Sequence, residues 1–212
     1  CIRDSIEVDG SDRGEYQVTN TVSACGNLII TGVVDGDLTG GLPKAVELYA
    51  LADIPDLGVY GLGSANNGDG TDGEEFNFPD GSLSAGDYYY IAVSSDGGEF
   101  AAFFGFPPDA FSDALLINGD DAIELFCNGV AYDVYGEIDV DGTGQSWEYT
   151  DGWAYRIDGA TTNGGGFADT LDWFVAEDSL VDVTVNSMAS YPFPIGTYDP
   201  PMIIPPAAVS YT

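Results

Sequence analysis

The sequence has no histidine and only four basic residues, Arg3, Arg13, Lys44 and Arg156, among its 212 positions. Without histidine, a Ser-His-Asp or Cys-His catalytic arrangement and an imidazole metal ligand are excluded. Nucleic-acid binding uses lysine and arginine to displace the counterions of phosphate, so we expect no DNA or RNA partner. The composition favours a protein that is not an enzyme, and a glycosidase working with two carboxylates is the one catalytic alternative left.

Long hydrophobic runs are also missing. No stretch of about 18 or more apolar residues occurs, so we expect no transmembrane segment. The chain is nevertheless 44% hydrophobic and 13% aromatic, far more than a disordered polyanion carries. Its length fits one large all-β domain, or one domain with extended arms.

Acidic residues dominate what is present, because 36 Asp and Glu give a net charge of −32. Such self-repulsion disfavours the compact state unless cations are held in or around the protein. The aspartates cluster with glycine and asparagine, which is typical of turns where several oxygens converge. We therefore predict Ca²⁺ as the cofactor, and adaptation to high salt is the alternative.

Two loops supply the candidate calcium ligands. Residues 139–144 place carboxylates two positions apart around a glycine turn, and residues 66–75 offer still more oxygens. The bidentate glutamate of an EF-hand is missing, although Glu148 is near enough to contribute. Solvated turns are the alternative for both loops. The predicted metal ligands are Asp139, Asp141, Thr143, Asn66, Asn67, Asp69, Asp72 and Glu74.

Two other acidic turns and two isolated glutamates receive simpler interpretations. In segments 35–37 and 118–121 we expect the aspartates to form Asx turns that set strand register. Glu47 and Glu124 lie inside apolar strands, where an outward position is the default, and pairing with Lys44 or Arg156 or a shared metal are alternatives. We expect Lys44 and Arg156 each to meet several acids, and Arg156 to stack on an aromatic ring.

The three cysteines are Cys1, Cys25 and Cys127. A cysteine at the first position is where a bacterial lipoprotein carries its lipid, so Cys1 is a lipidation candidate. Cys25 and Cys127 are then the disulfide candidate. A Cys1–Cys25 bridge, a bridge between subunits and buried thiols are the alternatives. The lipid and the bridges favour an exported protein.

Short strands with β-branched or aromatic residues, closed by Gly, Pro, Asn or Asp, recur along the chain. Asn128 and Gly129 supply the turn of a β-hairpin over 122–135, and residues 100–105 form at most one helical turn. The pattern predicts an all-β sandwich. The other predicted strands are 28–34, 45–50, 59–62, 75–78 and 87–93.

Both ends of the chain differ from this pattern. Residues 1–24 are polar and supply at most one or two edge strands. Residues 184–212 hold one charge, Asp199, and six of the eleven prolines, which cannot form a helix or a central strand. This apolar segment can wrap its own domain, pack on a neighbouring subunit or act as a linker.

Aromatic residues offer a further candidate surface. Trp147, Trp153, Trp173 and the run 88–90 could form a platform for a sugar, although we expect most of them in the core or at subunit contacts.

The order of segments resembles the lamin tail domain, in the form found in secreted bacterial proteins. The resemblance is carried by residues 28–36, 43–49, 63–68, 118–125, 153–156 and 192–198. It implies an immunoglobulin-like β-sandwich with a non-catalytic, extracellular role; the chromatin binding of nuclear lamin tails is not carried over. We therefore divide the chain into an N-terminal arm (1–24), a lamin-tail-like sandwich (25–198) and a proline-rich C-terminal arm (199–212).

These observations predict a bacterial extracellular or cell-surface structural protein. We expect it to assemble with copies of itself through its terminal arms, as a filament or surface-layer subunit, with Ca²⁺ stabilising the acidic loops. The alternative is a binding or adhesion module for surface polysaccharide or for another protein.

Overall fold

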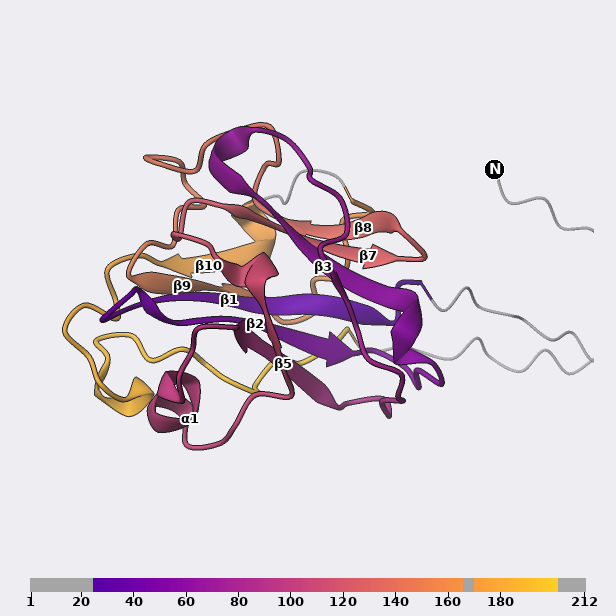
Figure 1. Cartoon of the computed structure of the whole chain (residues 1–212), viewed down its shortest axis with the longest axis horizontal. Helices are drawn as coiled ribbons and strands as arrows, with labels where there is room; N and C mark the ends of the chain where they lie inside the picture. The colour runs from indigo at the N-terminus through magenta and orange to yellow at the C-terminus, as the bar shows by residue number, and fades with distance from the viewer. Residues whose placement is uncertain (1–24, 166–169, 202–212) are drawn as a thin grey trace, which may run out of the picture.

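The computed structural model describes residues 25–165 and 170–201, which form two β-sheets (Figure 1). The first sheet has the spatial order β10 (Trp173–Ala176), β9 (Gly152–Arg156), β1 (Leu28–Leu38), β2 (Leu42–Ala50), β5 (Tyr88–Val93) and β6 (Ala110–Ser112). The second has the order β4 (Phe76–Asn77), β3 (Tyr60–Ala65), β7 (Ala122–Cys127) and β8 (Val130–Tyr135). Neighbouring strands are antiparallel, except that β5 and β6 are parallel. The all-β prediction is confirmed.

Helical structure in the described residues is confined to short turns. The α-helix α1 (Glu99–Phe104) confirms the helical turn predicted at 100–105. The 3-10 turns are η1 (Leu57–Val59), η2 (Asn66–Gly68), η3 (Asp113–Leu115), η4 (Thr170–Asp172) and η5 (Asn186–Met188). No helix in the described part of the chain is long and apolar enough to cross a membrane.

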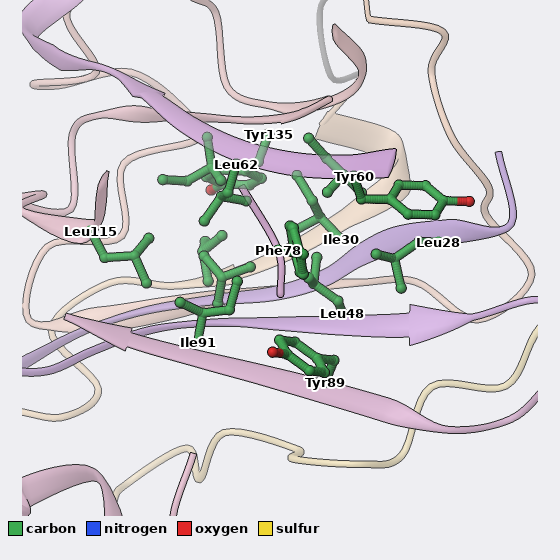
Figure 2. Close-up of a cluster of buried hydrophobic side chains, with 14 of the residues drawn as sticks. Leu28, Ile30, Leu48, Tyr60, Leu62, Phe78, Tyr89, Ile91, Leu115 and Tyr135 are labelled. Atoms are coloured by element: carbon green, nitrogen blue, oxygen red, sulfur yellow. The ribbon is translucent and has the colours of Figure 1, made fainter. Parts of the chain in front are cut away.

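The main core lies between the two sheets. Figure 2 shows Leu28, Ile30 and Leu48 of the six-stranded sheet on one side of this core, with Leu62 and Tyr135 of the four-stranded sheet on the other. All five side chains are fully or almost fully buried. Burying such a side chain contributes roughly 1.5–3 kcal/mol, so the contact between the sheets is a large source of stability.

The outer face of the six-stranded sheet is covered as well. Ile29 and Val34 of β1 point to this side, where Phe100 of α1 and Phe193 join a second apolar cluster. We call residues 191–199 the C-terminal strap, because they cross this face; α1 and the segment leading to the strap lie beyond the sheet in Figure 1. Since β1 is buried on both faces, it reads as a nearly continuous apolar run.

The hairpin predicted over 122–135 is confirmed, since β7 pairs with β8 and both turn residues have positive φ (Asn128 52°, Gly129 75°). At its tip the structure joins Cys25 to Cys127 by a disulfide across a sequence separation of 102 residues. Residues 1–24 and 202–212, including Cys1 and most of the C-terminal arm, lie outside the described residues.

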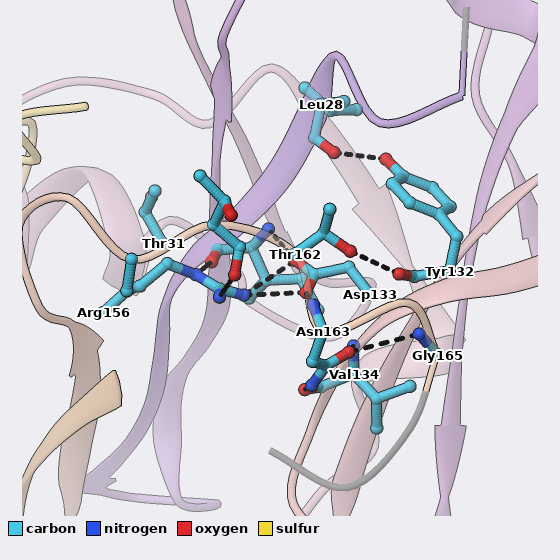
Figure 3. A network of polar contacts seen from close by, with 12 residues as sticks. Leu28, Thr31, Tyr132, Asp133, Val134, Arg156, Thr162, Asn163 and Gly165 are labelled. Carbon is cyan, nitrogen blue, oxygen red and sulfur yellow. Dashed lines mark hydrogen bonds and ion pairs between the residues drawn. The ribbon is translucent and has the colours of Figure 1, made fainter. Parts of the chain in front are cut away.

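One ion pair links the two sheets through the core (Figure 3). Arg156 of β9 donates to both carboxylate oxygens of Asp133 on β8, at 2.9 and 2.7 Å. Its Nε donates to the carbonyl of Ile30, while the Ile30 N–H donates to Asp133. The guanidinium also lies over the ring of Trp173, 4.5 Å from its centroid, so the predicted stacking occurs on this ring.

Candidate functional site

Two of the loops singled out in the sequence meet at one end of the sandwich. After β3 the chain turns through η2, and the Gly70 N–H donates to the carbonyl of Ile138 at 3.0 Å. A Cβ on Gly68 would lie 2.3 Å from the amide nitrogen of Asp141, so only glycine allows this close approach. The loop at 66–70 therefore packs directly against residues 138–141.

Asp121 fastens a third loop to the same place. Its carboxylate accepts the Asn67 N–H at 2.8 Å and the Asn118 N–H at 2.9 Å, and the side chain has no exposed surface. Asp121 thus closes the turn at 118–121 by accepting from the residue three positions before it, whereas the predicted Asx turn would accept from a residue two positions after. The two bonds also bring Asp120 and Asp121 to the two predicted calcium loops.

Asp120 and Asp141 face the turn at 141–143. Thr143 donates its hydroxyl to Asp120 at 3.0 Å and its backbone N–H to Asp141 at 2.9 Å. Burial raises the pKa of Asp120, and the neighbouring Asp121 and Asp141 add to this effect, whereas the bonds from Thr143 lower the pKa of Asp141. The Asp120 Oδ1 atom is buried without a hydrogen-bond partner among the described residues.

The structure divides the predicted ligand set in two. Asp139, Asp141 and Thr143 lie at the end described above together with Asn66, Asn67 and Asp69. Asp72 and Glu74 instead follow the chain over the outer side of the four-stranded sheet. Glu74 lies against Gly61: a Cβ added at Gly61 would lie 2.1 Å from the Glu74 carboxylate.

Glu124 lies beside this second group. Burial raises the pKa of Glu124, as do the charges of Glu75 and Asp72, while a hydrogen bond from Thr71 lowers it. Its Oε2 is buried without a hydrogen-bond partner among the described residues. Neither Glu124 nor Glu47 forms an ion pair with Lys44 or Arg156.

The acidic end has few protein cations to balance it. Lys44 and Arg156 are the basic residues of the described part of the chain, and they pair with Asp35 and Asp133. Each therefore meets one carboxylate in a salt bridge, fewer than expected. Within residues 25–165 and 170–201, no three acidic or cysteine side chains are grouped so that they could hold a metal ion. Calcium at the acidic end would need backbone carbonyls and water as additional ligands.

Glu47 of β2 marks a different kind of site on the outer face of the six-stranded sheet. The side chain is 2% exposed and accepts hydrogen bonds from the hydroxyls of Thr31 and Tyr155, both at 2.8 Å, and from the Gly196 N–H at 2.7 Å. Burial raises the pKa of Glu47 to about 7, against the lowering effect of these donors. The outward position predicted for Glu47 thus turns out to be covered by the C-terminal strap.

A pocket of about 300 Å³ opens beside the strap on this face. Its lining residues are Trp153, Tyr155, Arg156, Ile157, Asp158, Phe174, Pro194 and Thr197. Phe174 is about half exposed, whereas Trp153 is almost buried and donates its indole N–H to the carbonyl of Tyr191 at 2.8 Å. The pocket can offer an aromatic face and a carboxylate to a ligand.

The other aromatic candidates have structural positions. Trp147 and Trp173 belong to the core between the sheets. Tyr89 points into that core, while Tyr88 and Tyr90 stack on the opposite face with ring centroids 6.2 Å apart. Alternation along β5 explains this division, as expected.

Sequence reasoning gave no special role to Asp133 and only a turn role to Asp121. Asp133 lies in a strand in which polar and apolar residues alternate. Nothing in its neighbours Val134 and Tyr135 indicates that its side chain pairs with an arginine 23 residues later. For Asp121, the Asn-Gly-Asp-Asp sequence predicts a turn. Only the folded structure shows which backbone N–H groups donate hydrogen bonds to its carboxylate.

No protein-family model matches the chain, and no curated protein matches it. Fold and site together define an all-β protein of two packed sheets, with aspartate-rich loops gathered at one end and a strap-covered sheet face.

Proposed function

We propose that this chain is a non-catalytic extracellular structural module of the lamin-tail kind, which binds Ca²⁺ at its acidic end and associates with copies of itself. The observation that carries the proposal is the convergence of loops 66–70, 118–121 and 138–143. Their contacts bring Asp120, Asp121, Asp139 and Asp141 to one end of the sandwich.

Calcium suits this end better than a protein cation does. Lys44 and Arg156 are already engaged by carboxylates, and Asp120 keeps a buried oxygen without a hydrogen-bond partner in the described structure. Ca²⁺ accepts six to eight oxygens in a flexible geometry, including carbonyls and water, so it does not need a compact cage of carboxylates.

Two further features support an exported, self-associating protein. The disulfide between Cys25 and Cys127 is typical of proteins in oxidising compartments. Apolar side chains are exposed near the strap in spite of the high charge: Phe174 is 51%, Tyr191 62% and Met188 72% exposed. Exposed apolar surface of this kind marks association sites.

Calcium titration of the full chain, followed by calorimetry and light scattering, tests the proposal. We expect saturable binding of Ca²⁺ but not of Mg²⁺ at the same ionic strength, and an increase in particle mass with binding. Asp120→Asn should weaken binding, while Asp80→Asn, which alters an exposed aspartate outside the three loops, should leave it unchanged. Equal responses to Ca²⁺ and Mg²⁺ would contradict the proposed calcium site, and a mass that stays constant would contradict self-association.

The pocket beside the strap favours a second function, binding of a surface polysaccharide. Phe174 offers a half-exposed ring of the kind that stacks on a sugar, and Asp158 lies beside it as a hydrogen-bond acceptor. Retention of the protein on a panel of neutral and acidic polysaccharides tests this function. We expect the wild-type chain to be retained and Phe174→Ala to lose this retention. Phe111→Ala, which removes another half-exposed phenylalanine, should keep it.

A further inference from the structure

The buried carboxyl of Glu47 connects three strands to the C-terminal strap. Thr31 of β1 and Tyr155 of β9 donate to one carboxyl oxygen, and the Gly196 N–H of the strap donates to the other. Tyr155 also accepts the Thr197 N–H at 3.1 Å. Two consecutive strap amides are therefore tied to the sheet through this one group.

The other strap contacts run through aromatic rings, an amide side chain, backbone groups and the Asp158 carboxylate, which accepts the Asp199 N–H at 2.9 Å. Phe193 packs on Trp153 and Tyr155, and its N–H and carbonyl bond to the amide side chain of Asn186 at 2.8 Å. Tyr88 donates to the carbonyl of Tyr198 at 3.1 Å.

Among the described residues, neither basic side chain is paired with Glu47 to balance its ionisation, since Lys44 and Arg156 pair with Asp35 and Asp133. The titratable side chains that interact with it are Tyr155 of β9 and Tyr88 and Tyr90 of β5. Burial, together with the charge of Glu47, raises the pKa of all three tyrosines, so they remain neutral. Thr31 of β1 has no titrating group, and α1 contributes apolar side chains to the outer face of the six-stranded sheet. Lys44, on the same strand as Glu47, is paired with Asp35.

We propose that Glu47 is a proton-operated latch: the protonated carboxyl, whose O–H can donate to the Thr31 hydroxyl while the Gly196 N–H still donates to it, holds the C-terminal strap on the six-stranded sheet, and ionisation of Glu47 loosens the strap. This device acts independently of calcium and of self-association. Because Pro194 and Thr197 line the pocket described above, the latch also determines whether one wall of that pocket is fixed.

The direction of the effect follows from linkage. Burial raises the pKa of Glu47 from its ordinary 4.5 to about 7 when the strap is closed. The closed strap therefore binds the proton more tightly than an open one, and its extra stability is complete below pH 4.5. That stability is lost as the pH rises to about 7 and then stays constant. Within this window the opening constant should rise about tenfold per pH unit.

Hydrogen exchange of the full chain, followed by NMR between pH 5 and 8, tests the latch. After correction for intrinsic exchange rates, protection of the Gly196 and Thr197 amides should fall about tenfold per pH unit up to pH 7 and then level off. Protection of the Val46 amide, in the centre of the same sheet, should not follow this course. If the strap amides and Val46 show the same pH dependence in the wild-type chain, the latch does not exist.

Variants separate the charge of Glu47 from its hydrogen bonds. Glu47→Gln keeps the shape and cannot ionise, so protection of the two strap amides should lose its pH dependence. Glu177→Gln, which removes an exposed carboxyl after β10, should leave the wild-type profile unchanged. A wild-type profile in Glu47→Gln would overturn the proposal, and if this variant does not fold, the wild-type comparison with Val46 still decides.

Discussion

Asp133 and Arg156 face each other between the two sheets, with an N–O distance of 2.7 Å and side chains that are 0% and 1% exposed. Within the described structure, the other hydrogen bonds of this pair go to main-chain atoms, those of Ile30, Thr161 and Asn163. The pair therefore holds a strand of each sheet and the connection at 161–163 in one register (Figure 3).

Breaking this pair should destabilise the protein strongly. Asp133→Asn leaves a buried guanidinium without its counter-charge, which typically costs about 3–5 kcal/mol in the free energy of unfolding. Lys44→Met breaks the less deeply buried pair with Asp35 and should cost less, because the Lys44 side chain keeps some contact with water. Urea denaturation of the three proteins measures both effects, and a loss below about 1 kcal/mol for Asp133→Asn would mean that the buried pair acts like a surface one.

The disulfide is expected to be a second large contribution. Replacing both Cys25 and Cys127 with alanine frees a loop that spans 102 residues, and we expect a loss of about 2–5 kcal/mol. Reduction of the wild type by dithiothreitol should lower the urea midpoint by a similar amount, and the double variant should not respond to the reductant. An unchanged midpoint on reduction would show that the bridge is not formed in solution.

The contact between β1 and the strap can be tested at Gly32. A Cβ there would lie 2.4 Å from the ring of Phe193, so Gly32→Ala must displace this ring and should cost about 1–3 kcal/mol. Gly81→Ala is the matched control, because its Cβ would meet a single atom, at 3.9 Å. Thermal unfolding checks the pair, and equal melting temperatures would contradict the close packing of the strap on β1.

Local elements were predictable from the sequence, because their causes are local. The Asn128-Gly129 turn selects a hairpin through its positive φ angles, and the alternation in 88–93 assigns Tyr89 to one face of the sheet and its neighbours to the other. The short apolar runs at 28–34 and 45–50 both became strands, although each begins or ends several residues from the prediction.

Tertiary partners were not predictable in this way. Glu47 and Gly196 are 149 residues apart, and nothing in either segment indicates that one accepts a hydrogen bond from the other. The same holds for the third acidic loop: the sequence predicts a turn role for Asp121, and its bond to Asn67 depends on the pairing of β3 with β7, in which Ala65 lies opposite Ala122. Because they are close in sequence, Asp72 and Glu74 are predicted to share a calcium site with Asn66. In the structure they lie instead on the outer side of the four-stranded sheet.

The most direct test of the proposed calcium-bound end is thermal unfolding of the full chain in EGTA, Ca²⁺ or Mg²⁺ at one ionic strength. At a Ca²⁺ concentration about 100 times the dissociation constant, binding should add about 2.7 kcal/mol of stability. The account predicts a higher melting temperature in Ca²⁺ than in Mg²⁺, and loss of this difference in Asp120→Asn but not in Asp80→Asn. Identical melting temperatures in EGTA, Ca²⁺ and Mg²⁺ would contradict it.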